Sequence, residues 1–262
     1  MFGNLGRDPT GFGHEVREYI ATTDLTWGVT PHFALRATIP VVWQSVDSDV
    51  LDHSGHGGSG GGNPFPFPFP FPGDGGTTAH PLGSDFGIDD ITVGFKWRVY
   101  ERDFGPIDTL RFAIIGGVET PTGADAYSSD SWDPEIGGVI SYIRGRNGVN
   151  ASLEWKFNTG KHPLNLHAGM GGDDALFYDA SYLFRLLPSQ YGAHTNSALY
   201  LLLEANGIYE TNGDNEILLA PGLMYETRDM AFEFAVQLPG YQDIENRPKT
   251  NITFTAGIRF FF

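Results

Sequence analysis

The segment "NITFTAGIRFFF" (residues 251–262) places an apolar residue at every second position, from Ile252 to Phe262. The residues between them are small or charged, apart from Phe261. Successive side chains of a β-strand point to opposite faces, so this period of two predicts a strand with one apolar face. Terminal residues of water-soluble domains are usually polar and poorly ordered. An aromatic residue at position 262 therefore indicates that apolar surroundings cover this face of the strand.

The same alternation recurs along the chain and is clearest in "ITVGFKWRV" (91–99) and "VNASLEWKFN" (149–158). No segment longer than about ten residues shows the helical period of 3.6, and no apolar run approaches the roughly 20 residues of a membrane helix. We predict eleven strands, at residues 15–27, 33–46, 89–101, 109–120, 134–145, 149–159, 175–187, 197–211, 215–227, 230–239 and 251–262.

The composition separates this chain from ordinary soluble domains. Aromatic residues make up 14% of the 262 residues and charged residues only 18%, against about 25% charged residues in soluble domains. Glycine and proline, at 35 and 17 residues, indicate many turns. The absence of cysteine excludes disulfides and thiolate metal sites, and the net charge of −16 argues against nucleic-acid binding.

The predicted strands have an apolar face that is aliphatic in the middle and aromatic near the ends. Trp27, Trp43, Trp97 and Trp155 lie close to strand ends, as in the aromatic girdles of outer-membrane barrels. A soluble β-sandwich is the alternative. We predict an all-β, antiparallel up-and-down β-barrel in the outer membrane of a Gram-negative bacterium. It forms one domain over 1–262, with a long low-complexity extracellular loop at 47–88.

The strand count predicts a further element, because single-chain bacterial barrels have an even number of strands. We expect a signal peptide and a twelfth strand upstream of Met1, with residues 1–13 as the alternative source of that strand. Ile258, Phe260 and Phe262 are the expected signal for the barrel-insertion machinery.

Charged residues on the polar faces are expected to line the lumen. Two interpretations stay open: the charges pair and fill the interior, or they form a constriction that sorts solutes by size and charge. The predicted lumen residues are Asp24, Arg36, Lys96, Arg98, Arg111, Glu119, Glu154, Lys156, Asp179, Arg185, Glu204, Glu233 and Arg259.

The loop "HSGHGGSGGGNPFPFPFPFPGDGG" (53–76) combines a flexible glycine tract with a Phe-Pro repeat that favours polyproline II. Phe65, Phe67, Phe69 and Phe71 would form a docking strip for a partner in the cell envelope. The alternative is a low-complexity insertion, since long loops cost little free energy.

The histidines and the acidic loops suggest no catalytic centre. His53, His56 and His80 have no fixed geometry for a metal, and none of the eight histidines lies on the apolar face of a strand. We predict no enzyme, metal or cofactor. Acidic outer loops such as "DSDVLD" (47–52) suit cation-bridged contact with lipopolysaccharide, although solubility explains them equally.

Several segments resemble a family of outer-membrane transporters named after the meta-cleavage pathway of phenol degradation. The resemblance implies a β-barrel associated with uptake of aromatic or other hydrophobic compounds. The segments are "SDFGIDDITVGFKWRVY" (84–100), "GGVETPTG" (116–123), "NGDNEILLAPGLMYE" (212–226), "FEFAVQLP" (232–239) and "FTAGIRFFF" (254–262).

We expect a narrow channel for small hydrophobic or aromatic solutes. A closed barrel that binds a partner through the Phe-Pro loop is the second hypothesis. A sleeve around a larger trans-envelope complex is the third.

Overall fold

The computed structural model describes residues 2–7, 15–47, 84–124, 127–160, 172–192 and 195–261. These residues form thirteen β-strand segments and no helix. The segments are β1 (Phe2–Arg7), β2 (Glu15–Thr30), β3 (Phe33–Asp47), β4 (Ser84–Ile88), β5 (Ile91–Asp103), β6 (Thr109–Thr120), β7 (Asp133–Arg144), β8 (Asn147–Lys156), β9 (Ala175–Leu187), β10 (Ser197–Glu210), β11 (Asn215–Thr227), β12 (Met230–Asp243) and β13 (Thr250–Phe260). None of the described residues forms a helix long and apolar enough to span a membrane.

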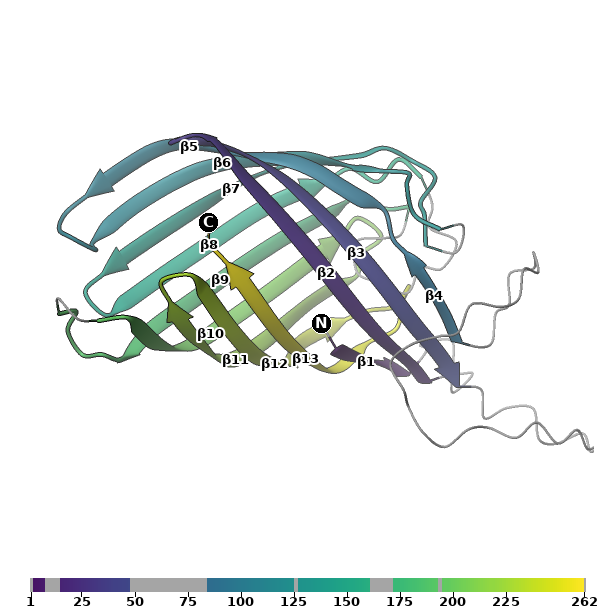
Figure 1. The fold of residues 1–262 in the computed structure, drawn as a ribbon. Coiled ribbons are helices and arrows are strands. Elements are labelled where there is room, and N and C mark those ends of the chain that lie inside the picture. Colours follow the sequence, from purple (N-terminus) through teal and green to yellow (C-terminus); the bar gives the residue numbers. More distant parts are fainter. Residues whose placement is uncertain are drawn as a thin grey trace, which may run out of the picture.

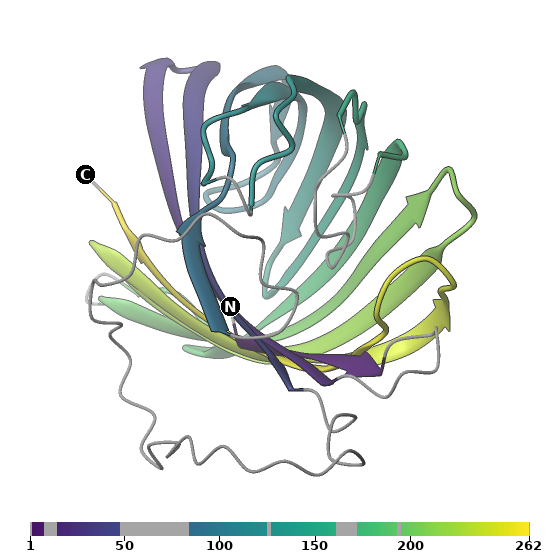
Figure 2. The ribbon, with the colours of Figure 1, turned by 90° about the vertical axis from the view of Figure 1, so that its right-hand side faces the viewer.

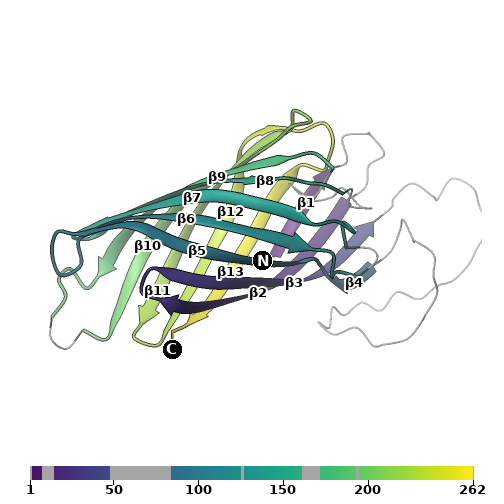
Figure 3. The same cartoon turned by 90° about the horizontal axis from the view of Figure 1, so that it is seen from above.

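The strands form one antiparallel sheet that closes on itself. From β5 to β13 each strand pairs with its neighbour in sequence, and β3 connects β2 to β5. β1 pairs with the first residues of both β13 and β2, and so joins the two edges of the sheet at that end of the strands. Figure 2 shows the strands curving as one wall, and Figure 3 shows the strands of opposite walls crossing at an angle. The predicted all-β barrel is confirmed, since the tilt is that of a closed sheet.

The ring has twelve strand positions. β4 and β5 both pair with β3 and are interrupted at Asp89 and Asp90, so these two segments share one position. In the structure the twelfth position is filled by β1. The alternative source, residues 1–13, is the one observed. The sequence signal was weak because β1 has only six residues, "FGNLGR", and two of them are glycines.

The connections differ at the two ends of the barrel (Figure 1). At the short-turn end, β2–β3, β7–β8 and β11–β12 are joined by only two residues each. At the opposite, long-loop end, the chain between β3 and β4 runs from residue 48 to residue 83. This alternation of short and long connections is typical of outer-membrane barrels.

The outer face carries the large apolar side chains. Trp27 is 69% exposed and Ile258 is 61% exposed, and many other leucine, isoleucine and phenylalanine side chains of the strands are open in the same way. Water-soluble proteins rarely expose apolar surface on this scale. The alternate positions of each strand, which are small or charged, therefore face the interior of the barrel.

Candidate functional site in the barrel lumen

The lumen wall contains two cross-strand rows in which a cation and a carboxylate face the same space. In the first row, Arg36 of β3 pairs with Gly94, Gly94 with Gly117, and Gly117 with Glu135 of β7. Directly opposed residues have their side chains on the same face of the sheet. Arg36 and Glu135 therefore lie on one wall, separated by two glycines.

The second row repeats this arrangement one step along the barrel. Lys96 of β5 pairs with Ile115, Ile115 with Gly137, and Gly137 with Glu154 of β8. In both rows the carboxylate lies three strands beyond the cation. The two rows are adjacent, because Gly94 and Lys96 are two residues apart on β5.

The glycines of the first row keep the space between the charges free of side chains. A Cβ atom on Gly117 would lie 2.7 Å from Oε1 of Glu135 and 2.9 Å from the carbonyl oxygen of Val93. A Cβ atom on Gly94 would lie 2.6 Å from the carbonyl oxygen of Gly116. These contacts are too short for any larger residue without a backbone shift.

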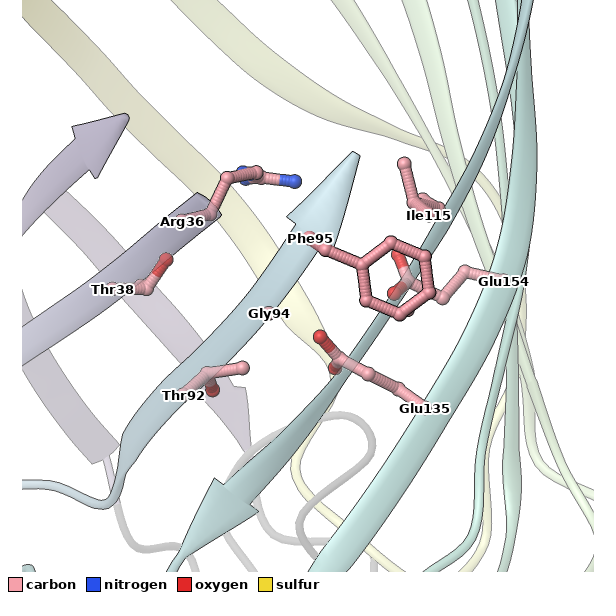
Figure 4. A pocket seen from close by; sticks show the side chains of 9 residues that line it. Arg36, Thr38, Thr92, Gly94, Phe95, Ile115, Glu135 and Glu154 are labelled. Atoms are coloured by element: carbon pink, nitrogen blue, oxygen red, sulfur yellow. The ribbon is translucent and has the colours of Figure 1, made fainter. Parts of the chain in front are cut away.

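A cavity of about 210 Å³ lies over this part of the wall. Figure 4 shows the Arg36 side chain on one side and the carboxylates of Glu135 and Glu154 on the other. Its lining residues are Arg36, Thr38, Thr92, Gly94, Phe95, Ile115, Gly116, Glu135 and Glu154.

Five charged side chains in the described part of the lumen wall make neither an ion pair nor a hydrogen bond. Arg36 and Lys96 make no ion pair or hydrogen bond with another described residue, and the same holds for Glu135, Glu154 and Glu204. Arg36 nevertheless attracts the Glu154 carboxylate through space. The cavity thus contains separated charges of both signs.

The charges without partners occupy different arcs of the ring according to their sign. Lys96 is repelled by Arg36, Arg98 and Arg111, all of which lie on β3, β5 and β6. The carboxylates without a partner begin at β7, because Glu101 of β5 is paired with two arginines and Glu119 of β6 with Lys156. On β10, Glu204 is repelled by Asp179 of β9 and Glu233 of β12.

Other lumen charges are paired at the two ends of the barrel. At the short-turn end, Glu101 forms ion pairs with Arg98 at 3.2 Å and with Arg111 at 2.9 Å. Arg98 also donates to the carbonyl oxygen of Pro31. At the long-loop end, Nζ of Lys156 lies 2.8 Å from Oε1 of Glu119.

Glu101 and Glu135 were absent from the predicted lumen residues. The parity of β5 assigns Glu101 to the apolar face, but a bulge between Arg98 and Tyr100 turns it inward to pair with Arg111. An isolated charge on an otherwise apolar face was the available signal. Glu135 alternates with Ile136, which is 48% exposed on the outer face, so period-two reading of β7 could have found it.

Several other predicted lumen residues have polar or ionic partners. Asp24 accepts a hydrogen bond from Thr38 at 2.7 Å, and Asp179 accepts one from Ser152 at 3.1 Å. Arg259 lies 3.7 Å from Glu233, with both side chains largely exposed.

Arg185 is buried at the short-turn end. It donates to the carbonyl oxygen of Pro188 at 3.1 Å, and its guanidinium lies 3.8 Å from the ring centre of Tyr191. These contacts hold the turn after β9, and Arg185 does not line the cavity.

The remaining predictions concern residues at the barrel surface or outside the described part of the chain. Ile258 and Phe260 are 61% and 58% exposed, whereas Phe262 lies outside the described residues. The Phe-Pro strip (Phe65, Phe67, Phe69 and Phe71) and His53, His56 and His80 also lie outside them. Within the described ranges, no group of three or more His, Asp or Glu side chains is arranged to hold a metal ion.

Comparison with known proteins identifies a family and a similar solved fold. A family model described as "Putative MetA-pathway of phenol degradation" matches residues 14–251. The structure is similar to the crystal structure of the COG4313 outer membrane channel from Pseudomonas putida F1, with a TM-score of 0.53 and 13% sequence identity. The match covers 99% of this chain and 92% of that chain, and at this identity it shows the fold alone. No curated protein matches the chain.

Proposed function

The chain belongs to the MetA-pathway family of phenol degradation, and we propose on this basis that it forms a narrow channel through the bacterial outer membrane. Its outer face suits hydrocarbon, because apolar side chains such as Trp27 and Ile258 are open to the surroundings. We assign the chain transport rather than catalysis.

The observation that carries the proposal is the cavity in the lumen with its unpaired charges. Charges that served only to fill the interior would be paired, because an unpaired buried charge is costly. Arg36, Glu135 and Glu154 instead line a cavity of about 210 Å³ without forming ion pairs. Such side chains are stable when water or a solute occupies the space between them.

Small aromatic or other hydrophobic compounds are the solute class that family membership supports. A ring of twelve strand positions is intermediate between eight-stranded barrels, which side chains fill, and barrels of sixteen or more strands with a broad aqueous channel. The proposed partners are outer-membrane lipid, lipopolysaccharide and the barrel-insertion machinery. This machinery would recognise Ile258 and Phe260. Docking of an envelope protein on the Phe-Pro strip is a further hypothesis.

Planar-bilayer conductance and liposome swelling with phenol-sized solutes test the channel. We expect discrete conductance steps and swelling that heat-denatured protein does not produce. Arg111→Ala should raise the conductance and shift ion selectivity towards cations, because it removes a partly exposed lumen cation beside Glu101. Folded, inserted protein that produced neither conductance nor swelling would overturn the proposal and favour a closed, partner-binding barrel.

A further inference from the structure

The two charge rows have the geometry of a polarised wall. In each row the cation and the carboxylate are separated by three strand spacings, roughly 14 Å along the sheet. Arg36 and Glu135 are held apart in this way by Gly94 and Gly117, which admit no side chain. The opposite charges therefore cannot neutralise each other by contact.

The separation extends around the lumen. The cations without partners, Arg36 and Lys96, lie on β3 and β5, which are neighbours in the sheet, whereas Arg98 and Arg111 are paired with Glu101. The carboxylates without partners, Glu135, Glu154 and Glu204, lie on β7, β8 and β10. A lumen with cations on one arc and carboxylates on another has an electric field across its axis, and low-dielectric walls concentrate that field.

Such a field acts differently on solutes of different charge. A monovalent ion is attracted by one arc and repelled by the other. A neutral solute gains little electrostatic free energy from either arc. A molecule with a carboxylate at one end and a cationic group at the other gains at both ends once it lies across the axis, provided that it fits.

We infer that this lumen prefers small bipolar solutes, in which a carboxylate faces Arg36 and Lys96 and a cationic group faces Glu135 and Glu154. This inference rests on the proposed channel function and narrows its solute class. The cavity of about 210 Å³ admits only a small molecule, aromatic or aliphatic.

Liposome swelling with two solutes of similar size tests the inference on the full chain. The probes are γ-aminobutyrate, which is bipolar at pH 7, and erythritol, which is neutral. We expect γ-aminobutyrate to enter about threefold faster or more than erythritol in the unmodified protein. Equal rates for the two solutes would overturn the inference.

Two double substitutions, one in each arc, test the contributions of the cations and of the carboxylates separately. Arg36→Gln with Lys96→Gln, and Glu135→Gln with Glu154→Gln, should each reduce the rate ratio towards one. They should also move the reversal potential in a salt gradient in opposite directions. Arg144→Gln, at the exposed last position of β7, is the matched control and should change neither quantity.

Salt provides a test that needs no substitution. Raising KCl from 0.1 M to 1 M shortens the screening length from about 10 Å to about 3 Å and should remove most of the preference. A rate ratio that persists in 1 M KCl, or survives both double substitutions in folded protein, overturns the inference while the channel stands. Failure of both solutes to enter, with no conductance, overturns the channel itself.

Discussion

Gly207 and Tyr178 are directly opposed on β10 and β9, and the tyrosine ring lies flat against the glycine. A Cβ atom on Gly207 would lie 2.0 Å from Cε2 of Tyr178 and 2.4 Å from Cζ. The ring is also held at its far end, because its hydroxyl lies 2.7 Å from Oδ1 of Asn215. A glycine in a strand interior is unfavourable by itself, so its place here is explained by the ring that covers it.

Gly207→Ala should therefore destabilise the barrel by about 1–3 kcal/mol, because the ring must move and the Asn215 hydrogen bond is strained or lost. Unfolding by urea in lipid vesicles, followed by tryptophan fluorescence, measures the change. Gly28→Ala is the matched control, since no atom lies within 4 Å of the added Cβ. Equal stability of the two variants would show that the Tyr178 ring adapts without cost.

Asp90 is a second residue with a large local effect, because it holds the connection between β6 and β7 in place. It is 2% exposed and lies between β4 and β5 at the level where β6 ends. Its carboxylate accepts hydrogen bonds from the backbone of Thr122, Gly123 and Ser129 and from the hydroxyls of Ser128 and Ser129, all between 2.8 and 2.9 Å.

At the scale of elements, these bonds tie the connection between β6 and β7 to the break between β4 and β5. The ring of Tyr127 from that connection would lie 2.6 Å from a Cβ atom on Gly87 of β4. Nearby, Asp133 accepts hydrogen bonds from Ser131 and Thr159. Buried carboxylates thus hold the long-loop end together where the sheet no longer supplies hydrogen bonds.

Asp90→Asn should loosen this connection. The amide NH₂ would replace a carboxylate oxygen that accepts hydrogen bonds, and it would then face an N–H or O–H group that is also a donor. The expected local cost is about 1–3 kcal/mol. Amide hydrogen exchange of residues 121–124 and 127–133 measures it. Asp130→Asn is the control, because Asp130 is exposed and its positive φ of 54° suits asparagine.

The same carboxylate predicts a dependence on pH. Burial alone would raise the pKa of Asp90, but hydrogen bonds from Ser129, Gly123 and Ser128 hold this pKa below its ordinary value. A lowered folded pKa gives stability that is complete above the unfolded pKa of about 4 and is lost as the pH falls through the folded pKa. Exchange in this connection should therefore not differ between pH 5 and pH 8 once the intrinsic rate is corrected, and protection should fall only below about pH 4.

At the scale of the whole molecule, the short segment β1 joins the two edges of the sheet. β1 pairs with β13 from Phe2↔Phe254 to Leu5↔Thr250, and with β2 from Phe2↔Tyr19 to Arg7↔Glu15. Without β1, these parts of β2 and β13 would present unpaired N–H and C=O groups. Such groups have no partners in hydrocarbon, so a closed barrel must satisfy them internally.

Deletion of residues 2–7 should therefore lower the thermal midpoint of the inserted barrel. Each lost backbone hydrogen bond exposes groups that cost about 1–3 kcal/mol when unsatisfied. Heat-modifiable migration on gels gives the midpoint. Deletion of residues 57–62, within the glycine tract of the long loop, is the control and should change it little, since loop length has a weak effect on free energy. Equal midpoints for both deletions would contradict closure by β1.

Much of this architecture was predictable from local pattern. Residues 215–227 were predicted as a strand and form β11 with the same bounds, and residues 109–120 likewise form β6. The orientation of most side chains was also predictable, because alternation along a strand indicates which side chains contact hydrocarbon and which face the lumen. Bulges were not predictable in this way, and the inward turn of Glu101 is the clearest result of one.

The linear chain alone thus established a barrel, its outer face and most of its lumen charges, because these properties depend on a period of two within single strands. Only the folded molecule showed that β1 closes the ring, that Gly94 and Gly117 separate Arg36 from Glu135, and that Lys96 shares a row with Glu154. These facts depend on register between strands that are distant in sequence. A shift of one residue in any ladder would exchange the two faces, and no local pattern specifies which residues become neighbours across four strands.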